Sequence, residues 1–199
     1  MSHVATTALL PLGKALLREL KAAAAAPAGP PDGWELLGTY KVLSGPVNGL
    51  YRVAIPADNP IRLRHGDTDI VVPFAEMDTD FGSVPGWCRT VAASLHLFSL
   101  HFAHDAYPKS TIGHDAFYAA GCGYAVRGGR AVKVVIPRAA ADAWLMIGLR
   151  CEGASRADVL AYSAAVKRHG GAAWYEHRKN PPNFPPLFQA VEPPPENQV

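Results

Sequence analysis

The chain has 199 residues, 49% of them hydrophobic, and a formal net charge of +2 at pH 7. That length supports one domain with a sizeable core and short appendages. Lysine and arginine form no dense block, which argues against a nucleic-acid-binding surface, and no apolar run is long enough to span a bilayer. Three cysteines without close pairing argue against a disulfide framework or a cysteine zinc site, and suit a reducing compartment.

Residues 1–33 are predicted to form a helical arm and a linker. Leucines recur at helical spacing over residues 8–26, and prolines and glycines between 27 and 33 end the helix. This helix either packs on its own domain or docks on a partner. Its polar face carries both charge signs and no Trp or Phe, which favours a protein partner over a lipid surface.

Strands and turns are predicted from residue 34 to about residue 79. Short apolar runs alternate there with the turn-forming sequences Ser44-Gly45-Pro46 and His65-Gly66-Asp67. The predicted strands cover residues 36–43, 50–55, 61–64 and 69–74. Prolines at positions 56, 60 and 73 place these strands near edges or ends, which indicates a small antiparallel sheet.

A histidine-rich helix is predicted over about 85–106, with Ser83 as its N-cap. Asp80, just before it, is either a local cap or part of a site. The histidines of this helix are His96, His101 and His104. A metal site needs ligands that converge from three or four places, and no His-Glu-x-x-His pattern is present, so we interpret these histidines as mostly structural.

The main candidate site lies in the stretch Ser110–Tyr124, on a helix predicted around His114. His114 and Tyr118 are four residues apart and share one face, which Asp115 flanks. A histidine, a carboxylate and a phenol on one helix suit catalysis or metal binding, but also a simple helix-packing contact. The glycines that follow this helix predict loops around a short strand at 131–136.

A deeply buried helix is predicted over residues 138–150, because this segment is apolar almost all round. Its one acid, Asp142, lies on an apolar stripe. A carboxylate in such a place is costly unless it meets a hydrogen-bond partner. The predicted partner is the ring of His114.

A last helix is predicted to start at the capping-box-like sequence Ser155–Asp158 and to stop at Gly170-Gly171. Residues 174–178 extend it or form a second short piece. Residues 179–199 are a proline-rich tail, expected to be extended and either free or laid on a partner. The sequence thus predicts an α+β fold: a single domain at 34–178 with a small antiparallel sheet from the N-terminal half, packed by three or four helices from the C-terminal half.

Three motifs occur along the chain in the order Thr79-Asp80-x-x-Ser83-x-Pro85, His114-Asp115-x-x-Tyr118 and Ala141-Asp142. This order resembles a phage and prophage family of small uncharacterised domains, over roughly residues 34–175. The resemblance implies a tailed-bacteriophage origin. It leads to the hypothesis of a structural or assembly component of the virion, tail-associated and made in the host bacterial cytoplasm. Under this hypothesis, residues 8–26 and 181–199 bind other virion proteins.

The His-Asp-x-x-Tyr pattern is also similar to the active site of phospholipases A2. That likeness implies that His114 is a general base, that Asp115 holds calcium, and that Asp142 and Tyr118 fix the imidazole. The expected upstream calcium loop is missing unless the segment 80–83 replaces it, which makes Asp80 a second predicted metal ligand. The alternative hypothesis is therefore a metal-dependent hydrolase, directed at lipid or cell wall, with a His114/Asp142 dyad. Under the structural hypothesis the same residues form a buried polar network.

Overall fold

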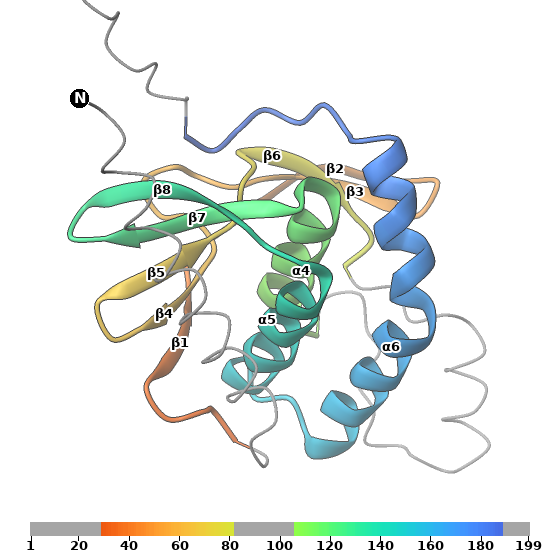
Figure 1. Ribbon diagram of the computed structural model, residues 1–199. Coiled ribbons are helices and arrows are strands. Elements are labelled where there is room, and N and C mark those ends of the chain that lie inside the picture. The colour runs from red at the N-terminus through yellow and green to blue at the C-terminus, as the bar shows by residue number, and fades with distance from the viewer. Residues whose placement is uncertain (1–28, 82–105, 189–199) are drawn as a thin grey trace, which may run out of the picture.

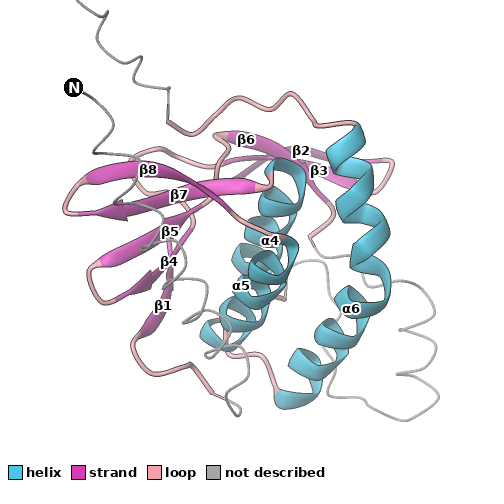
Figure 2. Ribbon diagram, in the orientation of Figure 1, coloured by secondary structure: helices cyan, strands magenta, loops and turns pink. Residues whose placement is uncertain are grey.

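The computed structural model describes residues 29–81 and 106–188. Within these ranges three helices pack with two antiparallel sheets (Figures 1 and 2), which confirms the predicted α+β fold. The helices predicted at 8–26 and 85–106, with the three histidines of the second, lie outside the described residues. None of the helices in the described ranges is long and apolar enough to cross a membrane.

The larger sheet has five strands in the order β1-β4-β5-β7-β8, all antiparallel to their neighbours. Its strands are β1 (Trp34–Leu37), β4 (Arg62–His65), β5 (Thr68–Val71), β7 (Cys122–Arg127) and β8 (Arg130–Val135). The turn predicted at residues 65–67 joins β4 to β5. Across that hairpin the Asp69 carboxylate bridges Arg62 and Arg64 at 3.2 and 2.8 Å, which stabilises the pairing of the two strands.

The smaller sheet has the order β2-β3-β6. Its strands are β2 (Lys41–Val47), β3 (Leu50–Ala54) and β6 (Glu76–Thr79). The predicted strand over 36–43 is wrong, because the chain leaves one sheet and enters the other at Gly38, where φ is +99°. The turn predicted at Ser44–Pro46 is also misplaced: the β2–β3 hairpin turns at Asn48-Gly49, where both φ angles are positive.

Helix α4 (Pro108–Ala120) is the helix predicted around His114. It stops because Gly121 adopts the left-handed conformation, with its N–H bonded to the carbonyl of Phe117. The predicted loop after it is instead strand β7, which contains Gly123 and Tyr124. A Cβ at Gly123 would lie 2.6 Å from the Phe117 ring and 2.9 Å from the carbonyl oxygen of Val71, so this glycine allows helix and sheet to approach closely.

Helix α5 (Arg138–Cys151) matches its predicted range and is the buried centre of the fold. It packs along α4, and Figure 1 shows both helices between the five-stranded sheet and α6 (Arg156–Lys179). The ring of Trp144 is 1% exposed and meets Phe117 edge-on, with centroids 5.4 Å apart. The α4–α5 contact is therefore the core that holds the candidate site.

Helix α6 continues through Gly170-Gly171 to Lys179, so the predicted stop at these glycines is wrong. Gly170 packs against the Tyr118 hydroxyl, where a Cβ would overlap that oxygen. The carbonyl of Val166, one turn earlier, accepts a 2.8 Å hydrogen bond from Arg138. Because Gly170 has no side chain, α6 lies close to α4 and α5. This close packing offsets the poor helix propensity of glycine.

Replacing Gly170 by Ala should destabilise the protein, although Gly→Ala in a helix normally stabilises. Overpacking against Tyr118 should cost about 1–3 kcal/mol in free energy of unfolding. Gly171→Ala is the matched control, because its nearest neighbour, the Arg138 guanidinium, would lie 3.2 Å from the new Cβ, and the added methyl favours helix. Denaturant unfolding of both variants tests this, and equal stabilities would contradict the close-packing role of Gly170.

The first part of the proline-rich tail, residues 181–188, lies on the domain itself. Ala75 donates a 2.9 Å hydrogen bond to the carbonyl of Pro185, and Leu187 donates one of 2.8 Å to the carbonyl of Pro73. Leu187 is 6% exposed within the core, and Phe184 meets Phe74 edge-on. This segment, which we call the strap, therefore belongs to the folded unit; residues 189–199 lie outside the described ranges.

Two truncations should distinguish the contribution of the strap to stability from that of the residues after it. Deleting residues 181–199 removes a buried leucine and two backbone hydrogen bonds, which should cost about 2–5 kcal/mol of unfolding free energy. Deleting residues 189–199 alone should leave the melting temperature within a few degrees of wild type. If both truncated proteins have the melting temperature of the wild type, the strap contributes nothing to the stability of the fold.

Candidate functional site

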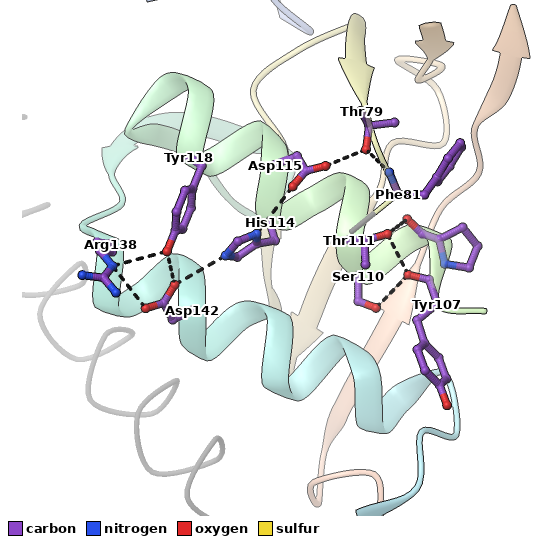
Figure 3. A network of polar contacts seen from close by, with 11 residues as sticks. Thr79, Phe81, Tyr107, Ser110, Thr111, His114, Asp115, Tyr118, Arg138 and Asp142 are labelled. Atoms are coloured by element: carbon purple, nitrogen blue, oxygen red, sulfur yellow. Dashed lines mark hydrogen bonds and ion pairs between the residues drawn. The ribbon is translucent and has the colours of Figure 1, made fainter. Parts of the chain in front are cut away.

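Helices α4 and α5 present the predicted site residues to one another. His114 and Tyr118 occupy one face of α4, with their ring centroids 4.1 Å apart, and Asp142 projects from α5 toward both (Figure 3). The His114 ring Nε2 lies 3.4 Å from Asp142 Oδ1, and the Tyr118 hydroxyl donates a 2.5 Å hydrogen bond to the same oxygen. The predicted pairing of Asp142 with His114 is present in the structure.

Helix α4 is held at both ends, which fixes the position of His114. At its start the Glu152 carboxylate accepts hydrogen bonds from the backbone N–H groups of Lys109 and Ser110, at 3.1 and 2.9 Å. At its end the Arg178 guanidinium donates to the carbonyl of Ala119 at 2.8 Å. An anion at the N-terminus and a cation at the C-terminus also suit the helix dipole.

Asp142 is ionised at neutral pH. Burial alone would raise the pKa of this carboxyl, but the hydrogen bonds from His114 and Tyr118 and the charge of Arg138 bring it below its usual range. The Arg138 Nε lies 3.6 Å from Asp142 Oδ2 and 3.3 Å from the Tyr118 hydroxyl. The carboxylate that looked costly on the apolar stripe therefore has three partners.

Asp142, the closer of the two carboxylates beside the His114 ring, favours a proton on Nε2. An ionised carboxylate only accepts hydrogen bonds, so Nε2 must donate to it. In the neutral ring the lone pair is then on Nδ1, which lies 3.6 Å from Asp115 Oδ1. The geometry thus leaves the nitrogen on the Asp115 side as the basic one.

Two carboxylates also determine how basic His114 is. Burial lowers the pKa of the imidazole, but hydrogen bonding and charge from Asp115 and Asp142 outweigh that effect, so the pKa is raised above its usual value. For Tyr118, burial first and the hydrogen bond to Asp142 second raise the pKa, which keeps the phenol protonated at neutral pH.

Asp115 connects the helices to the smaller sheet. The Thr79 hydroxyl, at the end of β6, donates a 2.6 Å hydrogen bond to Asp115 Oδ2 and accepts one of 3.0 Å from the N–H of Phe81 (Figure 3). Thr79 therefore joins the Thr79-Asp80 pair to the cluster by a direct hydrogen bond. Its side chain fixes the carboxylate that flanks the histidine.

A cavity of about 410 Å³ lies beside this cluster. His114 and Asp115 line it, and the His114 side chain remains 11% exposed. The strap contributes Pro182 and Phe184 to the wall, and one face of α6 contributes the stripe that runs through residues 165, 169, 173 and 177. The histidine is thus buried on the Asp142 side and open on the cavity side.

The two predicted metal ligands fit a calcium ion poorly. Asp80 and Asp115 line the same cavity, but Asp115 is already engaged by Thr79 and His114. Over residues 29–81 and 106–188 the structure contains no group of three or more His, Cys, Asp or Glu side chains arranged to hold a metal ion. Calcium prefers six to eight oxygen ligands, so the described side chains alone do not provide a site for it.

Reasoning from sequence missed Thr79 and Arg138 as members of the site. Thr79 is the first residue of the Thr79-Asp80 motif. Arg138 lies four residues before Asp142 on the same helix, so the signal that could have found it is i,i+4 spacing. Comparison of the chain with protein-family models, curated proteins and solved structures finds no match. What this site does must therefore be argued from its geometry.

Proposed function

We propose that this protein is a hydrolase that cleaves carboxylic esters, with His114 as general base. The observation that carries the proposal is a histidine that lines a cavity, with Nε2 held by the partly buried Asp142 carboxylate and Nδ1 3.6 Å from Asp115. A base needs a partner that sets its tautomer and needs access to its substrate. The His114/Asp142 pair meets both requirements.

In the proposed reaction, His114 Nδ1 takes a proton from a water molecule, and the water oxygen attacks the ester carbonyl. The Asp142 carboxylate stabilises the imidazolium that forms and stays ionised itself. The carbon–oxygen ester bond then breaks, and the imidazolium returns its proton to the leaving alkoxide. Tyr118 and Arg138 act as positioning residues, because each contacts the Asp142 carboxylate.

Release of nitrophenol from nitrophenyl esters of graded acyl length tests the proposal. We expect hydrolysis above the buffer rate, with medium-length acyl chains preferred to acetate because the cavity is deep enough to hold them. A chelator such as EDTA should leave the rate unchanged, since no step uses a metal. Rates equal to buffer for every ester would overturn the proposal, and loss of activity with EDTA that calcium restores would establish the metal-dependent form instead.

The second candidate is a structural component of a tailed-bacteriophage particle, and one surface feature supports it. Among the described strands, β2 is an edge strand with a single neighbour, and Val42, Leu43 and Val47 on it are 45%, 47% and 68% exposed. An unprotected apolar edge strand is suited to pairing with another chain. Leu43→Lys with Val47→Lys should prevent co-purification with phage particles while the melting temperature is kept; normal incorporation would contradict this candidate.

A further inference from the structure

The cavity beside His114 has walls suited to an aliphatic chain. Its apolar lining residues are Leu50, Ala119, Leu145, Ala165, Val166, Ala173, Pro182 and Phe184. They come from β3, all three helices and the strap, so the apolar surface is a property of the assembled fold. A pocket of this kind takes up hydrocarbon because contact with it removes apolar surface from water.

The described lining of the cavity is rich in acidic side chains. The described lining residues include the carboxylates of Asp78, Asp80 and Asp115 and no lysine or arginine. Arg52 on β3 pairs with Asp78 and Glu76 at 3.3 Å each, and its guanidinium lies over the Phe184 ring, 5.3 Å from the centroid. The remaining basic side chains of the described lining are three histidines, His114, His169 and His177.

Aromatic rings share the cavity with these carboxylates. Tyr118, Tyr162 and Phe184 line it. Burial, followed by the charges of Asp158, Asp80 and Asp115, raises the pKa of Tyr162 to about 12, so its ring is within electrostatic reach of two of the lining carboxylates. Carboxylates beside aromatic faces attract organic cations, and quaternary ammonium groups in particular.

We infer that the cavity takes an amphiphile with an aliphatic chain and a cationic, quaternary-ammonium head. This inference rests on the proposed function and deepens it: the substrate class becomes the ester of an aliphatic acid with a cationic amino alcohol. Hydrolysis by His114 then releases the free acid and the amino alcohol. Anionic amphiphiles, including phosphate-bearing lipids, are disfavoured because their heads would meet carboxylates with no lysine or arginine in the described lining.

Binding of three octyl compounds with different heads tests the inference without reference to hydrolysis. Calorimetric titration of the full chain at pH 8.5, where ordinary histidines are neutral, compares octyltrimethylammonium, 1-octanol and octyl sulfate below their micelle concentrations. We expect the cation to bind most tightly, by about tenfold or more over the sulfate. Asp80→Asn should reduce this preference several-fold, whereas Asp67→Asn, on the β4–β5 turn, should not. Equal or tighter binding of the sulfate would overturn the inference.

Replacing either of two neighbouring alanines by phenylalanine shows whether binding occurs in this cavity. Ala173 lines the cavity and Ala172, its exposed neighbour on α6, does not. Ala173→Phe should weaken binding of the octyl cation at least tenfold, and Ala172→Phe should leave it unchanged; equal effects of the two changes would overturn the placement. Cation binding without ester hydrolysis would contradict the proposed function but not the binding preference. Ester hydrolysis without a preference for the cation would contradict only this inference.

Discussion

Replacing His114 by Gln should lower the kcat/KM of ester hydrolysis by about 10²- to 10⁴-fold, because a positioned general base contributes that much. Asp142→Asn should cause a loss in the same range. The amide presents N–H as well as C=O, so it no longer requires the proton on Nε2 and no longer stabilises the imidazolium. Steady-state kinetics of the purified variants measure both losses.

The matched control for these changes is His65→Gln. His65 stacks on Trp34 in the five-stranded sheet, with centroids 4.7 Å apart, and takes no part in the His114 cluster. This variant should keep wild-type kinetics within about twofold. A His114→Gln protein that is folded and fully active would remove His114 from the mechanism.

The pH dependence of the rate follows from the raised pKa of His114. A general base works when unprotonated, so kcat/KM should rise with pH through a midpoint above the usual histidine value of about 6.5. Asp142→Asn removes one of the charges that raise this pKa, so the residual activity should reach its midpoint at a lower pH. A midpoint that stays the same in the variant would show that another group limits the rate.

Gly113→Ala should strongly destabilise the protein. A Cβ at Gly113 would overlap the six-membered ring of Trp144, which is fully buried between α4 and α5. Overpacking of a dense core costs about 1–3 kcal/mol or more, and here the change also separates the helices that carry His114 and Asp142. Urea unfolding should show the lost stability, and the esterase rate should fall with it.

A second substitution identifies the cause of that loss. Trp144→Phe removes the atoms that the new methyl would strike, so the double variant Gly113→Ala/Trp144→Phe should lose less stability than the sum of the two single changes. The difference between the summed single losses and the loss measured for the double variant should be about 1–2 kcal/mol. Strictly additive losses would mean that the Gly113 contact with Trp144 is not what limits α4–α5 packing.

Glycines explain most of the differences between the predicted and observed fold. The sequence predicted the fold class, helix α5, the start of α6 and several strands, because hydrophobic periodicity and capping residues are local signals. Gly123 and Gly170 were interpreted as breaks in regular structure, yet each lies inside an element where a neighbouring chain approaches closely. A glycine that ends an element and one that admits a neighbour look alike in a single sequence.

The candidate site was predicted better than the chain around it. Helical spacing placed His114 and Tyr118 on one face, and the cost of burying a carboxylate pointed from Asp142 to the histidine. The contribution of Thr79 could not be predicted, because it depends on how the end of β6 meets α4. The cavity could not be predicted either, since its walls come from segments far apart along the chain.

The central claim is that His114 is a base with its proton on Nε2 and its lone pair on Nδ1. Nitrogen NMR of the ring, followed from pH 5 to 10 in wild type and in Asp142→Asn, measures this directly. We predict a neutral Nε2–H tautomer above a midpoint higher than about 6.5, and a lower midpoint in the variant. A proton on Nδ1, or an imidazolium that persists to pH 10, would contradict the claim.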